Sequence, residues 1–204
     1  MAYPTLFLIR HGDAEHNALD VASSYPEKRE YHLTELGRMQ AIAVAETLSG
    51  ERIDAILFSP MARTRETAEI IAEKTGAPLV EEPRLCEPGY GCFEGKSWKA
   101  LVAKYPPPLR RLVVDESDGV ESFHSLWNRL LPFCAEIAAL FGGKRVAIVS
   151  HGDVLQMLHS ILRGLTLGKA TLSGKRFHRG EMLRMDGEGM GGFYRDKGGH
   201  ENLS

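Results

Sequence analysis

Short, continuously apolar segments alternate along the chain with segments in which apolar residues recur every three or four positions. Three of the continuous segments are TLFLIR at 5–10, IDAILFS at 53–59 and RVAIVS at 145–150. Their length and their content of β-branched residues are typical of strands covered on both faces, as in a parallel sheet. The pattern therefore predicts a mostly parallel sheet that contains these three strands.

Helical periodicity occupies the intervals around these strands. The expected helices run from after Thr34 to Gly50, from Pro60 to Gly76, from Glu121 to Phe141 and from Asp153 to Arg163. Proline at a start and glycine at a stop are the usual helix boundaries. Strands that alternate with helices favour an α/β fold, a three-layer α/β/α sandwich with a mostly parallel central sheet.

Two stretches are less regular. Residues 83–119 contain a Gly-rich turn, three consecutive prolines and many charges, and they are expected to form a partly helical, cap-like excursion over one edge. Residues 187–204 are Gly-rich with little apolar material, which is typical of a tail. We therefore expect one domain over residues 1–186, followed by this tail.

Composition narrows the classes of protein. The 204-residue chain is 43% hydrophobic and 25% charged, with a formal net charge of −2, so nothing points to nucleic acid as a partner. No apolar stretch approaches the roughly 18 residues of a membrane helix, and the N-terminus does not resemble a leader, so we expect no membrane association and a cytoplasmic location. Three cysteines without a CxxC pair argue against a disulfide framework. A homodimer remains possible.

Candidate chemistry follows two of the predicted strands. The first strand runs into Arg10, His11 and Gly12, and the strand at 145–150 runs into His151 and Gly152. Ligands of open α/β sheets bind beyond the carboxyl ends of the strands, so the two imidazoles converge if their strands are neighbours. The helix expected from Asp153 would direct backbone N–H groups at the same place, which suits an anion.

A third strand leads into the helix expected from Pro60, which carries Arg63 near its N-terminal end. Two guanidinium groups, those of Arg10 and Arg63, together with two imidazoles describe a pocket for a dianionic phosphoryl group. A carboxylate would fill such a pocket less completely because it has only two acceptor oxygens.

Six ordered motifs make the chain similar to the histidine phosphatase superfamily, the phosphoglycerate-mutase-like branch. They cover about residues 5–165 and read LIRHG (8–12) with Asn17, LTELG (33–37), SPMARTRETAE (59–69), RLCEPGYGCFEG (84–95), GVES (119–122) and VSHGD (149–153). One RHG alone would be weak evidence, whereas six motifs in register are specific. The resemblance implies a phosphoglycerate mutase-like fold.

The resemblance also implies roles. His11 would attack phosphorus and become phosphohistidine, while Arg10, Arg63 and His151 would hold the phosphoryl oxygens. Asn17 and the amide of Gly152 would be further donors. Glu87 would protonate the leaving oxygen and then activate water.

Other motif positions receive smaller roles or none. No cofactor or metal is implied, since the arginines supply the positive charge. Glu94 is interpreted as structural, and His16 is left as a surface or core residue beside the pocket. Asp13 and Ala14 depart from the family's usual residues after RHG, a glutamate followed by threonine or serine, so any contact from that hydroxyl group is missing here.

Several classes of function compete. A cysteine phosphatase needs an arginine six residues after a cysteine, which no cysteine here has, and no HxH or HxxxH cluster suggests a metallohydrolase. Mutases of the family carry Arg and His shortly after the acid, where this chain has Pro88 and Gly89, so hydrolysis of a small phosphomonoester is favoured. A phosphoglycerate mutase and a noncatalytic phospho-ligand-binding relative remain the alternatives, and the substrate is open.

Overall fold

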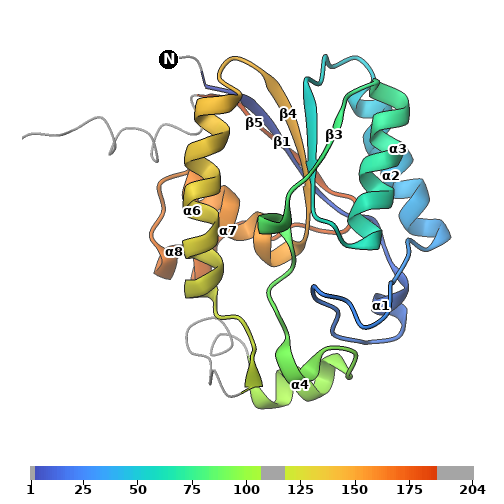
Figure 1. Ribbon diagram of the computed structural model, residues 1–204, viewed down its shortest axis with the longest axis vertical. Coiled ribbons are helices and arrows are strands. Elements are labelled where there is room, and N and C mark those ends of the chain that lie inside the picture. The colour runs from blue at the N-terminus through green and yellow to red at the C-terminus, as the bar shows by residue number, and fades with distance from the viewer. Residues whose placement is uncertain (1–2, 107–117, 188–204) are drawn as a thin grey trace, which may run out of the picture.

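The computed structural model describes residues 3–106 and 118–187 (Figure 1). Most of the predicted tail, and residues 107–117 toward the end of the predicted excursion, lie outside the described residues. Within the described ranges the chain forms one five-stranded sheet with helices on both faces. The predicted α/β class and the mostly parallel sheet are confirmed.

The sheet has the strand order β3-β2-β4-β1-β5. Its strands are β1 (Thr5–Arg10), β2 (Ala55–Phe58), β3 (Leu79–Glu81), β4 (Arg145–Ser150) and β5 (Met182–Met185). All neighbouring pairs are parallel except β1 and β5, which pair antiparallel. The three strands predicted from apolar runs are therefore the three central ones, and the two edge strands were not predicted.

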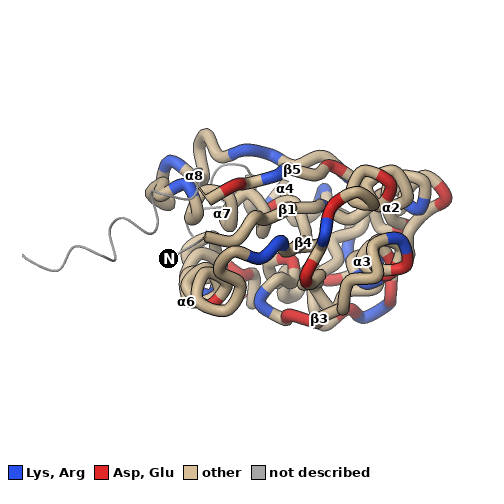
Figure 2. Tube along the Cα trace, turned by 90° about the horizontal axis from the view of Figure 1, so that it is seen from above, with Lys and Arg blue, Asp and Glu red and all other residues tan. Residues whose placement is uncertain are grey.

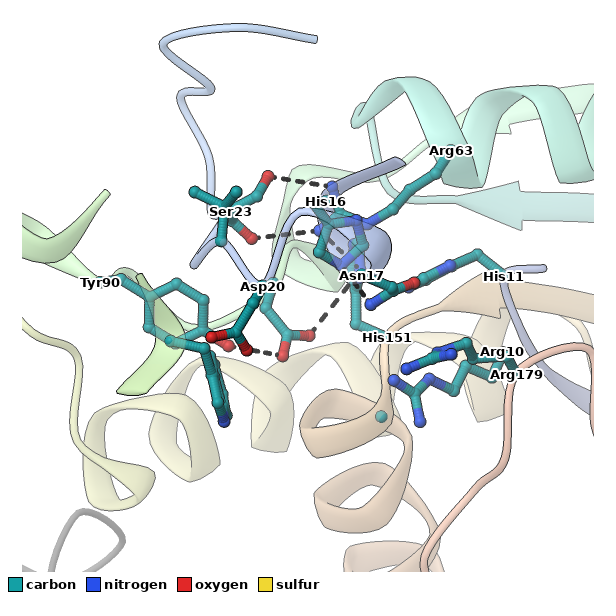
Figure 3. A pocket seen from close by; sticks show the side chains of 14 residues that line it. Arg10, His11, His16, Asn17, Asp20, Ser23, Arg63, Tyr90, His151 and Arg179 are labelled. Atoms are coloured by element: carbon teal, nitrogen blue, oxygen red, sulfur yellow. Dashed lines mark hydrogen bonds and ion pairs between the residues drawn. The ribbon is translucent and has the colours of Figure 1, made fainter. Parts of the chain in front are cut away.

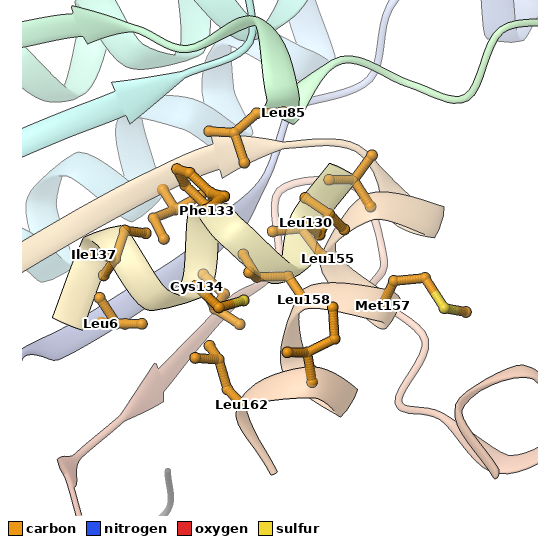
Figure 4. Packing of buried hydrophobic residues seen from close by; sticks show 14 of the residues in the cluster. Leu6, Leu85, Leu130, Phe133, Cys134, Ile137, Leu155, Met157, Leu158 and Leu162 are labelled. Atoms are coloured by element: carbon orange, nitrogen blue, oxygen red, sulfur yellow. The ribbon is translucent and has the colours of Figure 1, made fainter. Parts of the chain in front are cut away.

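Alternate side chains of β1 face opposite layers, as a strand covered on both faces requires. Leu6 and Leu8 pack with α6 (Phe123–Leu140), α7 (Gly152–Leu162) and α8 (Leu167–Ser173), a cluster shown in part in Figure 4. Phe7 and Ile9 pack instead with α2 (Glu35–Leu48) and α3 (Ala62–Thr75). These two clusters fix the three layers.

The predicted helix boundaries agree with the structure to within two residues. Thr34 is the N-cap of α2 and accepts a hydrogen bond from the amide of Gly37. Gly76 ends α3 in a left-handed conformation with φ of 71°. The helix expected from Pro60 begins at Ala62 instead, because Met61 still has extended backbone.

The described part of the excursion lies beyond the carboxyl ends of the central strands (Figure 1). It contains the 3₁₀ turns Pro83–Leu85 and Gly91–Phe93 and the helix α4 (Trp98–Lys104). A separate small apolar cluster holds it together, with Phe93, Leu101 and Tyr105 among its members. Ala22 belongs to the same cluster, so the loop after α1 (Glu15–Ala18) is fastened to the excursion.

Basic and acidic segments are interspersed around the periphery of the described chain (Figure 2). No helix in the ranges 3–106 and 118–187 combines the length and the apolar character that a membrane span needs.

Candidate active site

The two histidines that follow β1 and β4 lie side by side. These strands are hydrogen-bonded neighbours in parallel register, with Arg10 opposite Ser150. His11 and His151 come one residue later, and their ring centroids are 5.2 Å apart. The condition set by the sequence, that the two strands be neighbours, is met, so both imidazoles share one mouth of the sheet.

A cavity of about 290 Å³ opens at this mouth. All seven residues predicted for the site line it, drawn in close-up in Figure 3. They are Arg10, His11, Asn17, Arg63, Glu87, His151 and Gly152. The volume suits a phosphoryl group together with a small organic part, and it lies within the lower range of small-molecule sites.

His11 is oriented by its own backbone neighbour. Nδ1 lies 2.6 Å from the carbonyl oxygen of Gly12, which can only accept, so Nδ1 carries the hydrogen and Nε2 keeps its lone pair. Burial, and then the charges of Arg63 and Arg10, lower the pKa of His11 well below its usual value. The imidazole is therefore neutral at neutral pH, with one nitrogen free to act as a nucleophile.

Gly12 allows the chain to turn closely past α2. A Cβ atom on Gly12 would lie 2.3 Å from the carbonyl oxygen of Gly37, and one on Gly37 would lie 1.9 Å from that of Asp13. The glycine of the LTELG motif thus has a packing role. It lets the start of α2 support the backbone that carries His11.

Arg63 is held from behind by a buried carboxylate. Its Nη1 lies 2.9 Å from Glu27 Oε1, in an ion pair whose side chains are only 1% and 6% exposed. Ser23 receives further hydrogen bonds from the guanidinium at its hydroxyl and at its carbonyl oxygen. These contacts fix the guanidinium and leave its Nε buried without a partner.

Arg10 lies against the N-terminus of α7. A Cβ atom on Gly152 would be 3.2 Å from the guanidinium carbon, so glycine lets this cation lie close to the helix end. Nη1 donates to the carbonyl oxygen of Phe177 at 2.7 Å, whereas Nε is buried without a partner. Because α7 begins at Gly152, which lines the pocket, the N-terminal end of this helix faces the cavity, and helix N-termini favour bound anions.

His151 contacts three groups of the site. Its Nε2 lies 2.9 Å from the hydroxyl of Ser59, and its Nδ1 is 3.4 Å from Arg63 and 3.7 Å from Glu87. A guanidinium can only donate, so Nδ1 accepts from Arg63, and the ring hydrogen sits on Nε2 and is donated to the hydroxyl of Ser59. Burial and Arg63 lower the pKa of His151 well below its usual value, which keeps the ring neutral.

Glu87 has the properties of a proton donor at neutral pH. Burial, followed by the charge of Asp153, raises its pKa to about 7, against the opposing effects of Arg63, Arg10 and Tyr90. The Tyr90 hydroxyl donates to Oε1 at 2.9 Å. Oε2 is buried without a hydrogen-bond partner and is the oxygen nearer to His151.

Asn17 lines the pocket, but both ends of its side-chain amide form hydrogen bonds with neighbouring residues, whereas the family resemblance implies that it donates to the substrate. Its Oδ1 accepts the amide of Ala14 at 3.1 Å, so its Nδ2 must face His16, whose Nε2 is 2.9 Å away. Since Nδ2 donates, His16 Nε2 accepts and its hydrogen sits on Nδ1, which is buried without a partner. Burial, chiefly, lowers the pKa of His16 to about 3.

Several pocket residues were not predicted. His16 receives no role from the sequence alone, although its position directly before Asn17 is a usable signal. Arg179 also lines the pocket, and nothing in the local sequence marks it. Tyr90 and Trp98 of the excursion line it as well, together with Asp20, Val21 and Ser23 of the loop after α1. Glu94 does not line it; Oε2 accepts hydrogen bonds from the amide and hydroxyl of Ser24, in keeping with a structural role.

Unsatisfied polar atoms concentrate at this pocket. In the described ranges, seven buried side-chain nitrogens or oxygens have no hydrogen-bond partner. Four belong to pocket residues, namely Arg10 Nε, His16 Nδ1, Arg63 Nε and Glu87 Oε2. Unpaired buried polar groups are costly and rare in folded proteins. Three N–H donors and one acidic oxygen around one cavity are the groups that an anionic ester would satisfy.

No group of three or more histidine, cysteine or acidic side chains suited to a metal ion occurs in the described part of the chain.

Comparison with known proteins agrees with this geometry. The sequence profile of the histidine phosphatase superfamily (branch 1) matches residues 6–178, and the chain belongs to that superfamily. It is 33% identical over 168 residues to phosphoserine phosphatase 1 of Hydrogenobacter thermophilus, covering 80% of this chain and 78% of that protein. It is 34% identical over 165 residues to a probable phosphoglycerate mutase GpmB of Photorhabdus laumondii, covering 78% and 75%.

Among solved structures, a mycobacterial glucosyl-3-phosphoglycerate phosphatase in complex with VO3 superposes with a TM-score of 0.76 at 25% identity. The match covers 89% of this chain and 90% of that one. Proteins named as phosphatases occur among the relatives in both comparisons, which supports phosphatase activity.

Proposed function

We propose that this protein is a phosphomonoester hydrolase that acts through a phosphohistidine on His11, with a small phosphorylated metabolite as substrate and without a metal ion. The main support is a set of buried N–H donors without hydrogen-bond partners around the neutral imidazole of His11. Arg10 Nε, Arg63 Nε and His16 Nδ1 are buried without partners, and His11 Nε2 keeps its lone pair beside them.

In the first step Nε2 of His11 attacks phosphorus, and the bond from phosphorus to the ester oxygen breaks. The departing oxygen takes the proton of Glu87, so the alcohol leaves neutral and Glu87 becomes a carboxylate. A pKa of about 7 places Glu87 at half protonation at neutral pH in the substrate-free enzyme. A dianionic phosphoryl group nearby raises that pKa further, since like charges disfavour ionisation.

In the second step water attacks the phosphorus of phosphohistidine. The Glu87 carboxylate takes a proton from this water, the P–N bond breaks, and the electron pair returns to His11. Inorganic phosphate leaves and the enzyme is restored. General acid and base assistance of this kind is worth roughly 10² to 10⁴ in rate.

The guanidinium groups and the neutral His16 donor would hold the phosphoryl oxygens during both steps. Each well-placed donor is worth on the order of 10² to 10³ in rate, because it is fixed before the reaction begins. Glu27 fixes Arg63, and the carbonyl oxygen of Phe177 fixes Arg10, so little reorganisation is needed. Positive charge from these groups takes the part that a metal ion plays in other phosphatases.

A phosphoglycerate mutase is the second candidate, favoured by the relative of that name. Against it, the residues after Glu87 are Pro88, Gly89 and Tyr90, without the Arg and His expected of a mutase. A noncatalytic phosphate-binding relative is disfavoured because His11 and Glu87 are both present and both line the pocket.

The test is a panel of phosphomonoesters assayed for phosphate release in the presence of EDTA, with phosphoserine included because a relative is named for it. Wild type should release phosphate and form an acid-labile phosphoenzyme. His11→Ala should lose both, whereas His124→Ala, a change at an exposed histidine on α6, should lose neither. Undiminished turnover by His11→Ala, or dependence on an added divalent metal, would overturn the proposal. Phosphate transfer between phosphoglycerates without net release would favour the mutase.

A further inference from the structure

Arg179 is a third guanidinium in the pocket, and it reaches there from the loop between α8 and β5. The next residue fastens this loop to the end of β1. The amide of Gly180 donates to the carbonyl oxygens of Arg10 and His11, at 3.2 and 3.1 Å. Gly180 has a φ of 69°, and a Cβ atom there would lie 2.6 Å from the side chain of Gln40. Residue 179 is therefore held beside the nucleophile by backbone contacts.

The side chain of Arg179 is braced as well. Its Nη1 donates to Asp13 Oδ1 at 2.7 Å, and Asp13 Oδ2 accepts the hydroxyl of Thr34 at 2.9 Å. Asp13 is one of the two positions at which the sequence departs from its family pattern, and its carboxylate pairs with Arg179. In Figure 3 the side chains of Arg179 and Arg10 project into the same part of the pocket.

Arg179 differs from the other two arginines in its depth. The side chain of Arg63 is 1% exposed, whereas that of Arg179 is 44% exposed. In the proposed function, the donors to a phosphoryl group at His11 are Arg10 Nε, Arg63 Nε and His16 Nδ1, which are all buried. Arg179 stands nearer to solvent, where the rest of the substrate emerges.

We propose that Arg179 binds a second anionic group of the substrate, such as a carboxylate, and that the enzyme therefore prefers small phosphomonoesters that carry one. This inference rests on the proposed function, because that function places the phosphoryl group at His11. Guanidinium groups bind carboxylates through paired, charge-assisted hydrogen bonds. Asp20 lines the same pocket with an exposed carboxylate of opposite sign, so an anion is directed toward Arg179 and away from Asp20.

Two compounds with nearly the same skeleton test the proposal. 3-Phosphoglycerate carries a carboxylate where glycerol 3-phosphate carries a neutral hydroxymethyl group. Wild type should have the higher kcat/KM for 3-phosphoglycerate, and Arg179→Gln should lower the ratio of the two kcat/KM values about tenfold. Arg179→Lys should restore part of the ratio. Arg176→Gln removes the same charge from an exposed position in the same loop and should leave the ratio unchanged.

Three outcomes would overturn the inference. One is a wild type that turns over both compounds with the same kcat/KM, another is an Arg179→Gln variant with an unchanged ratio, and the third is an equal loss for both compounds. Equal loss would make Arg179 a further ligand of the phosphoryl group.

Binding separates this inference from the proposed function. Dissociation constants for both compounds are measured by calorimetry in the His11→Ala background, with and without Arg179→Gln. Selective weakening of 3-phosphoglycerate binding supports the inference even if wild type shows no turnover, an outcome that would end only the proposed hydrolysis. Turnover by wild type with no such selectivity in binding or in catalysis would end only the inference.

Discussion

Replacing Tyr90 with Phe removes one hydroxyl group that bears on the acidity of Glu87. The hydroxyl donates to Oε1 of Glu87 at 2.9 Å and is one of the groups that lower the pKa of this carboxyl. The ring of Tyr90 is buried and lies in an edge contact with Trp98, with centroids 5.7 Å apart. Phenylalanine keeps the ring, so Tyr90→Phe changes the acid with little change in packing.

The size of the effect follows from the contact. A hydrogen bond to a charged group is worth about 1.5–3 kcal/mol, and the protonated carboxyl retains part of it. One pKa unit corresponds to about 1.4 kcal/mol, so the pKa of Glu87 should rise by about one unit. The sign is upward, because the lost hydroxyl group stabilised the ionised form.

The measurement is the pH dependence of kcat/KM, which reports the pKa values of the substrate-free enzyme. Protonated Glu87 is the active form, so kcat/KM should fall as pH rises through about 7 in wild type. In Tyr90→Phe the fall should come about one unit later, which at pH 8 leaves about fivefold more of the maximal value. An alkyl phosphate should show the shift clearly, whereas p-nitrophenyl phosphate should show little, because its leaving group needs no proton. A falling limb that stays in place or moves to lower pH would refute the assignment of Glu87 as the acid.

Two further predictions concern residues around His11. His16→Phe removes a buried neutral donor and should lower kcat/KM about 100- to 1,000-fold for alkyl and aryl phosphates alike, at every pH above 5. His124→Phe should leave kcat/KM unchanged, and a loss confined to one leaving group would contradict the role of His16 in holding phosphoryl oxygens. Gly37→Ala places a Cβ atom 1.9 Å from the carbonyl oxygen of Asp13 and should lower the free energy of unfolding by about 3 kcal/mol in urea titrations. Gly50→Ala, where a Cβ atom meets nothing within 4 Å, is the control, and equal stabilities of the two variants would show that the contact is relaxed at no cost.

Local pattern was sufficient for the central strands and the long helices. Continuous apolar segments identify β1, β2 and β4 because both of their faces are buried. The edge strands were not predicted, because they are not buried on both faces. All three residues of β3 are exposed, and β5 is interrupted by the exposed Arg184, so neither has the apolar run of a central strand.

The site divides in a similar way. His11 and His151 could be placed from sequence because a strand ending in His-Gly fixes where its imidazole lies. The helix expected after the third strand placed Arg63 near them, and the resemblance supplied Glu87. The partners that tune them could not be placed. Glu27, which pairs with Arg63, lies in an irregular loop, and Arg179 joins Asp13 from 166 residues away in the chain.

The sequence by itself determined the α/β class, the motifs that follow the central strands and the types of side chain that can bind an anion. These features depend on periodicity and on residues close together in the chain. Only the tertiary structure decided that Glu87 has a raised pKa, that His16 presents a free N–H group and that Arg179 reaches the pocket. Desolvation, tautomer choice and ion pairing arise from atoms brought together by folding, and no local pattern encodes which distant segment will supply them.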